Sequence, residues 1–161
     1  MPPLEFHMTR ASDGAAVTAD AWRGKAVALY FGYTHCPDVC PTTLSNLADI
    51  LKRLGPDANR VAVLFVTVDP DRDTVPVLKQ YARAFAPQVV GLRGSPDAIA
   101  MLARRYRVAY RVTKESPGHP YTVMHTSAVF LFDPSGRARL VTLATGDTAG
   151  LAEDVKRLLR G

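Results

Sequence analysis

The chain has 161 residues with a net charge of +5, and 47% of its residues are hydrophobic. This length fits a single domain, which we expect to span residues 1–161 and to bury a core large enough to fold without a disulfide framework. The charge is mild and lacks the basic and aromatic motifs of nucleic-acid binding, so no nucleic-acid partner is expected. No apolar run is long enough for a membrane-spanning helix, and the first 25 residues carry charge throughout and lack the apolar segment of a secretion signal.

The first half of the chain alternates strand and helix. Apolar runs predict buried strands, and apolar residues at helical spacing between a Pro or a cap and a Gly-Pro stop predict helices. The predicted elements are a hairpin of Leu4–Met8 and Ala15–Thr18, a strand over Lys25–Tyr33, a helix over Pro41–Leu54, a strand over Val61–Val68, and a helix capped by Asp73 or Thr74 that ends near Phe85.

The second half adds a short strand and helix, an irregular hairpin, and a closing hairpin and helix. The predicted elements are Val89–Leu92, a helix capped by Ser95, an irregular hairpin of Val108–Val112 and Tyr121–Met124, strands Ser127–Phe132 and Ala138–Leu143, and a helix over Thr148–Arg160. Buried parallel strands followed by an antiparallel pair indicate an α/β fold with a central mixed sheet flanked by helices. A strand, a cysteine motif that opens a helix, and a final hairpin and helix form the thioredoxin-like plan.

Two cysteines, Cys36 and Cys40, lie between the first buried strand and the first long helix. This is the carboxyl end of a central strand, where α/β sheets place their functional sites. The free N–H groups and the dipole of the helix start favour thiolates, which act both as nucleophiles and as metal ligands. Four residues apart, the two sulfurs can share one metal ion or form a disulfide.

The spacing of the cysteines separates the chemical alternatives. Thioredoxin-type oxidoreductases use C-x-x-C, whereas this chain has C-x-x-x-C. A structural zinc site needs four ligands, and no second cysteine pair or H-x₃-H is present. Two thiolates and one imidazole suit Cu(I), which is soft. A peroxidase is disfavoured because Cys40 already occupies the helix start, so a copper site and dithiol redox chemistry both stay open.

Three segments carry a close resemblance to a known family. They are YFGYTHCPDVCPTTL at residues 30–44, VDPDRDT at residues 68–74, and YTVMHTS at residues 121–127, the last before a strand and a D-P-x-G turn. Together they resemble the Sco/SenC family, and the resemblance covers essentially the whole chain. It implies a thioredoxin-like fold with an N-terminal hairpin and an inserted hairpin before the strand that carries the histidine.

The resemblance also implies a function and a site. In that family the two motif cysteines and the downstream histidine bind copper, which here implies Cys36, Cys40 and His125 as ligands of one ion, preferably Cu(I), with Cu(II) also allowed. The implied function is a metallochaperone that delivers copper to, or prepares the thiols of, the dinuclear copper site of cytochrome c oxidase. The partner is then the copper-accepting subunit of that enzyme or another periplasmic copper protein.

An enzymatic function remains an alternative to this interpretation. The chain could act as a thiol–disulfide oxidoreductase on the copper-accepting subunit, with Cys36 and Cys40 as the redox pair; whether it is an enzyme is left open. Family members face the periplasm or the mitochondrial intermembrane space, usually from an N-terminal membrane anchor. We therefore expect a monomer on the periplasmic side of the bacterial inner membrane, with an anchor removed upstream of this chain.

The remaining candidate residues are weaker. His7 and His119 are predicted to be solvated, and His35 to point away from the cysteines although it adjoins Cys36. Asp69 ends a strand and could reach the surroundings of the copper site. Met124 stands where many family members carry Asp, and strand alternation places it on the opposite side from His125, in the core or against the neighbouring strand.

A local basic group comprises Arg104, Arg105, Arg107, Arg111 and Lys114. Surface charge is usually a solvated face, and the alternative for this group is a docking patch for an acidic partner.

Overall fold

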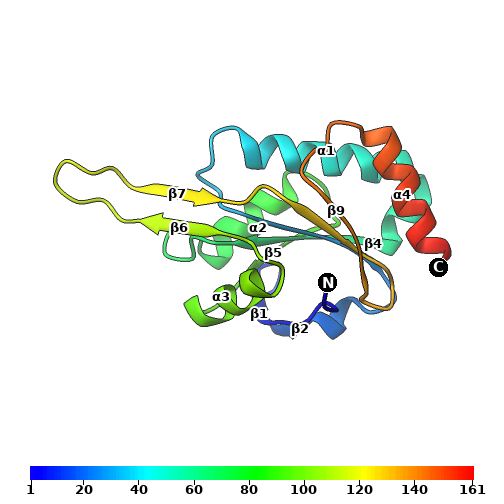
Figure 1. The fold of residues 1–161 in the computed structure, drawn as a ribbon, viewed down its shortest axis with the longest axis horizontal. Coiled ribbons are helices and arrows are strands. Elements are labelled where there is room, and N and C mark those ends of the chain that lie inside the picture. The colour runs from blue at the N-terminus through cyan, green and yellow to red at the C-terminus, as the bar shows by residue number, and fades with distance from the viewer.

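The computed structural model describes residues 1–161 as a seven-stranded mixed sheet between two layers of helices, with a separate two-stranded hairpin at one end (Figure 1). The elements are β1 (His7–Arg10), β2 (Ala16–Thr18), η1 (Ala19–Trp22), β3 (Ala26–Gly32), α1 (Val39–Leu54), η2 (Gly55–Arg60), β4 (Val61–Thr67), α2 (Val75–Arg83), β5 (Val89–Arg93), α3 (Pro96–Arg105), β6 (Tyr110–Thr113), β7 (Thr122–His125), β8 (Val129–Phe132), β9 (Ala138–Thr142) and α4 (Thr148–Arg160).

The sheet has the strand order β2-β1-β5-β4-β3-β8-β9. Strands β3, β4 and β5 are parallel to one another, while β8 runs antiparallel to β3 and β9 antiparallel to β8. The expected α/β mixed sheet with a thioredoxin-like order of elements is thereby confirmed. None of the helices is long and apolar enough to cross a membrane.

Strand β3 divides the core because its seven residues are all buried and alternate between two faces. Ala28 and Tyr30 pack with α1 and α4, whereas Leu29 and Phe31 pack with α3 and η1. A side chain at the carboxyl end of β3 is therefore fixed from both sides.

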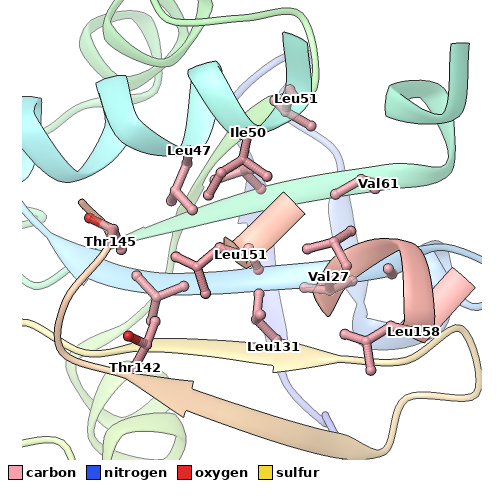
Figure 2. Close-up of a pocket in the computed structure, with 15 residues that line it drawn as sticks. Val27, Leu47, Ile50, Leu51, Val61, Leu131, Thr142, Thr145, Leu151 and Leu158 are labelled. Atoms are coloured by element: carbon pink, nitrogen blue, oxygen red, sulfur yellow. The ribbon is translucent and has the colours of Figure 1, made fainter. Parts of the chain in front are cut away.

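Under α1 and α4 the core contains one small void of about 20 Å³, shown in Figure 2. Its lining is almost entirely aliphatic, and Leu47, Leu131 and Leu151 point into it from α1, β8 and α4. An apolar void of this size is a packing gap between helices and sheet, not a ligand site.

Most element predictions are confirmed, and the differences have local causes. The first strand begins at His7 because Leu4 and Phe6 enter the core instead of the ladder, with the Leu4 N–H donating to the Gly136 carbonyl. Ser95 caps α3 as predicted, through a 3.1 Å bond from the Ala98 N–H. Thr74, one of the two predicted cap residues, occupies the N-cap position of α2, but its side chain makes no capping bond.

Candidate metal centre

The cysteine loop connects β3 to α1, where a tight turn brings both sulfurs to the end of the sheet. The Cys36 N–H donates to the Tyr33 carbonyl across this turn, and Cys40 is the second residue of α1. The Cys40 N–H then donates to the Cys36 sulfur over 3.4 Å. A free amide at the start of α1 thus donates to a cysteine sulfur. The sequence analysis expected this, because the N–H groups at a helix N-terminus stabilise negative charge.

Cys40 is fully buried, and its place depends on the glycine that ends β3. A Cβ on Gly32 would lie 2.7 Å from the Cys40 sulfur and 2.7 Å from the Phe65 ring. Gly32 therefore leaves the space in which the sulfur lies. Sequence reasoning missed this residue, although an isolated glycine in an apolar strand signals such a close approach.

His125 reaches the cysteines from the last position of β7. Its ring meets Tyr33 edge-on at 5.7 Å and Tyr30 at 6.2 Å between ring centroids. Its Nδ1 lies 3.2 Å from the Thr126 carbonyl, which can only accept, so Nδ1 carries the proton. This leaves Nε2 unprotonated and 3.5 Å from the Cys40 sulfur.

The three predicted site residues are brought together. The ligand atoms of Cys36, Cys40 and His125 all lie within 4.8 Å of one another. The two cysteines are free thiols, 8% and 0% exposed, and His125 is half-buried. Two sulfurs and one unprotonated imidazole nitrogen form a soft donor set with three members, which fits a Cu(I) ion.

Burial sets the protonation of the site. It raises the pKa of the Cys40 thiol to about 12. Burial also lowers the pKa of His125, against the bond to the Thr126 carbonyl. The expectation that the helix start makes both cysteines thiolates is thus wrong for Cys40 in the metal-free protein, because desolvation outweighs the helix dipole. A bound soft cation must displace the Cys40 proton.

A buried polar network holds the cysteine loop against the neighbouring strand. Asp73, which is fully buried, accepts hydrogen bonds from the Thr34 N–H at 3.0 Å, from the Thr34 hydroxyl, and from the Thr67 hydroxyl at 2.7 Å. Its side chain is therefore committed to the loop just before Cys36 and not to the helix cap that the sequence suggested.

Asp69 fixes the hairpin that carries His125. Its carboxylate accepts from the Arg72 guanidinium at 2.6 Å and from the Tyr121 hydroxyl, and Tyr121 directly precedes β7. The Arg72 guanidinium also stacks on the Tyr121 ring, 3.7 Å from its centroid. Asp69 makes no bond to the cysteines or to His125, so its effect on the site passes through the position of the hairpin.

The other candidates lie outside the group of three. His7 and His119 are exposed, as predicted. His35 is also exposed and faces Asp73, with its Nδ1 3.9 Å from the carboxylate. Met124 lies on the opposite side of β7 from His125 and pairs with Arg111 of the neighbouring strand, one of the two predicted places; it is 69% exposed, so the other, a place in the core, is wrong.

Known proteins are similar to this chain over most of its length. The SCO1/SenC family model matches residues 4–160. The chain is 43% identical over 117 residues to the mitochondrial Protein SCO2 homolog of Bos taurus, covering 71% of this chain and 44% of that protein. It is 36% identical to the SCO2-like protein RP587 of Rickettsia prowazekii, covering 78% and 62% of the two chains. The chain spans about half the length of the mitochondrial relatives it matches.

Solved structures agree over almost the whole fold. The copper-bound ScoI of Bradyrhizobium japonicum is 37% identical, with a TM-score of 0.87 over 98% of this chain and 99% of that one. The apo Sco1 protein of Thermus thermophilus is also 37% identical, with a TM-score of 0.86 over 97% and 91% of the two chains. With the family model matched from residue 4 to residue 160, this chain belongs to the SCO1/SenC family.

Proposed function

We propose that this protein carries one copper ion, as Cu(I), on Cys36, Cys40 and His125, and delivers it to the copper-accepting subunit of cytochrome c oxidase. The observation that carries the proposal is the convergence of two thiol sulfurs on an imidazole nitrogen freed by the Nδ1 contact to Thr126. Relatives of 37% and 36% identity whose structures contain copper support the choice of metal.

The chemistry of the donor set favours a cargo ion over a permanent one. Three ligands leave Cu(I) open to a fourth, so a thiol of a partner can add before a ligand of this chain leaves. Cys36 is the more accessible sulfur, 8% exposed against 0% for Cys40, and is therefore the first ligand that a partner reaches. For a bacterial chain the corresponding place of action is the periplasmic face of the inner membrane, in keeping with the mitochondrial relatives.

One observation favours a second candidate function. Two free thiols lie side by side at a helix start, and the sulfur of Cys36 accepts an amide hydrogen bond. Such a pair can reduce a disulfide in the copper-accepting subunit. Cys36 attacks one sulfur of that disulfide and releases the other as a thiol; Cys40 then attacks the Cys36 sulfur of the mixed disulfide, so that Cys36 and Cys40 form a disulfide and the partner leaves with two thiols. The thiols are the copper ligands, so the oxidised chain cannot hold Cu(I).

Competition for Cu(I) with a chromophoric chelator tests the proposed site. We expect one Cu(I) per reduced chain, and a loss of affinity of at least about a hundredfold for Cys36→Ser, Cys40→Ser and His125→Ala, because each removes one of three ligands. His119→Ala, which removes an exposed imidazole, is the matched control and should leave the affinity unchanged. Unchanged affinity in His125→Ala would contradict the proposal.

A further inference from the structure

The excess positive charge of the chain lies in a single stretch. Residues 104–114 carry five cations and no carboxylate, which leaves 15 lysine and arginine residues to balance 15 acidic residues in the rest of the chain. The five are Arg104, Arg105, Arg107, Arg111 and Lys114. The stretch runs from the end of α3 through β6, and β6 pairs with the strand that carries His125.

Three of these cations are not used by the fold. Arg105 pairs with Glu5 and donates to the Pro3 carbonyl, and Lys114 pairs with Asp71 at 2.6 Å. The other three, which we call the arginine face, are exposed, and their side chains make no hydrogen bond or ion pair. They are Arg104, Arg107 and Arg111.

The arginine face spans the last turn of α3, the connection after it and the start of β6. Arg104 is near Tyr110 at the start of β6, where its charge opposes the effect of burial on the Tyr110 pKa. Arg111 follows directly and, in the β6–β7 hairpin (Figure 1), pairs with Met124, and both side chains are exposed. Met124 and Met101, one helical turn before Arg104, are 69% and 68% exposed. Arginine and methionine are both enriched in protein interfaces.

The backbone of Arg107 provides a separate indication. Its φ is 58°, and it is the one residue other than glycine with a positive φ. It follows the C-cap of α3, where the Val108 N–H donates to the Ala103 carbonyl at 2.8 Å. Glycine is the favoured residue at this left-handed position because it has no Cβ. An arginine that is strained, exposed and unpaired contributes nothing to the fold that glycine would not provide at less strain.

We propose that the arginine face is the docking surface for an acidic patch on the protein with which this chain exchanges copper. The inference rests on the proposed function, because it identifies the partner by that exchange. Arg111 pairs with Met124, the residue before His125, so a partner bound there is beside the strand that presents His125, on the opposite face of that strand from the His125 side chain. The apolar part of this surface consists of two separated methionines. Such a surface fits the rim of a protein–protein interface better than a lipid bilayer, because insertion into a bilayer needs a continuous apolar face.

Binding to the soluble domain of the cognate copper-accepting subunit tests the proposal. The charge-reversal variant Arg104→Glu/Arg107→Glu/Arg111→Glu should bind at least about tenfold more weakly, with a loss that shrinks as salt rises. The control Lys25→Glu/Arg137→Glu/Arg160→Glu changes the net charge equally, on exposed side chains without ion pairs, and should bind like the wild type. Equal weakening in both variants, or no binding by the wild type, would overturn the proposal.

Two further measurements separate docking from folding, copper binding and lipid binding. Arg107→Gly should raise the midpoint of thermal unfolding and still weaken docking; a more stable variant with unchanged docking would contradict the role of Arg107. Cu(I) affinity should be the same in all variants, and a wild type that docks without binding copper would refute the proposed function alone. The charge-reversal variant is also tested for binding to vesicles of phosphatidylglycerol and phosphatidylcholine. If it lost binding to these vesicles but still bound the acceptor domain like the wild type, the arginine face would be a lipid-binding surface and the proposal would fail.

Discussion

At the scale of single residues, the two cysteines of the motif are unequal. Cys36 is slightly exposed and accepts the amide of the helix start, whereas Cys40 is fully buried with a pKa raised to about 12 by burial. The asymmetry suits a site in which Cys36 meets the partner and Cys40 anchors the ion. Cys40 in turn depends on Gly32, because the sulfur fills the space that any larger residue would need.

Gly32→Ala is expected to impair the site more than the fold. The new methyl group would lie 2.7 Å from both the Cys40 sulfur and the Phe65 ring, so one of them must move. Cys40 and Phe65 are both fully buried, so the packing around the Cys40 sulfur changes whichever group moves. We expect at least about a tenfold loss of Cu(I) affinity, with a destabilisation of about 1–3 kcal/mol from overpacking. Chelator competition and urea denaturation measure the two effects.

Gly146→Ala is the matched control for this change. No atom lies within 4 Å of a Cβ on Gly146, and its φ is not in the left-handed region. Its copper affinity and its free energy of unfolding should both stay close to those of the wild type. A Gly32→Ala protein that also bound Cu(I) like the wild type would show that the sulfur has more freedom than the packing implies.

At the scale of elements, the site is an assembly of three segments held by polar side chains. The cysteine loop is bound to the turn after β4 through Asp73, and the β6–β7 hairpin is bound to the same turn through Asp69 and Tyr121. The Tyr33 hydroxyl reaches the Val123 carbonyl over 3.5 Å and adds a direct link from the loop to β7. The turn at residues 69–73 thus positions the cysteines and the histidine together.

The β8–β9 turn shows how one carboxylate stabilises an element. Asp133 is buried and accepts from the Ser135 hydroxyl at 2.6 Å, from the Ser135 and Arg137 N–H groups at 3.0 Å, and from Arg139 at 3.2 Å. Burial opposes the charge of this carboxylate, but these donors outweigh it and lower the Asp133 pKa. The stabilisation is therefore complete above the unfolded pKa of about 4 and is lost as the pH falls through the lower folded value.

Asp133→Asn should reduce stability in a pH-dependent way. At pH 7 we expect a loss of about 1–2 kcal/mol, because the amide keeps one acceptor and turns N–H donors toward Arg139. The difference from the wild type should narrow as the pH falls below about 4, where the wild type loses the same contribution. Urea denaturation at neutral and acid pH measures it.

Asp20→Asn serves as the comparison for this turn. Asp20 is highly exposed and only loosely paired with Arg23 at 3.7 Å, so its replacement should have almost no effect at either pH. A loss in Asp133→Asn that stayed constant down to acid pH would show that the charge of the carboxylate is not what stabilises the turn.

At the scale of the whole molecule, apolar patterning was enough to predict the layers of the fold. Fully buried strands such as β3 and amphipathic helices such as α1 can be recognised from the pattern of apolar residues in the sequence. The same pattern placed Cys36 and Cys40 at the start of a helix. The side-chain partners could not be predicted in this way. Asp73 was expected to cap a helix and instead joins two loops, because that choice depends on Thr34 and Thr67, which only the folded chain brings near.

The position of His125 is a second feature that residue patterns alone could not predict. His125 lies 85 residues after Cys40, and only the folded chain brings β7 beside the cysteine loop. The spacing of residues in the sequence therefore could not select His125 from the four histidines. The resemblance selected it, and the structure shows that its Nε2 is the nitrogen turned toward the sulfurs. Met124 shows the opposite outcome, because alternation predicted its side of the strand correctly but not its exposure.

X-ray absorption spectroscopy at the copper edge of the Cu(I)-loaded protein tests the central claim most directly. The site described here predicts two sulfur scatterers and one nitrogen scatterer per copper, with the nitrogen lost in His125→Ala and all three retained in Met124→Leu. A third sulfur that disappears in Met124→Leu, or a nitrogen that survives in His125→Ala, would contradict the assignment of Cys36, Cys40 and His125 as the copper site.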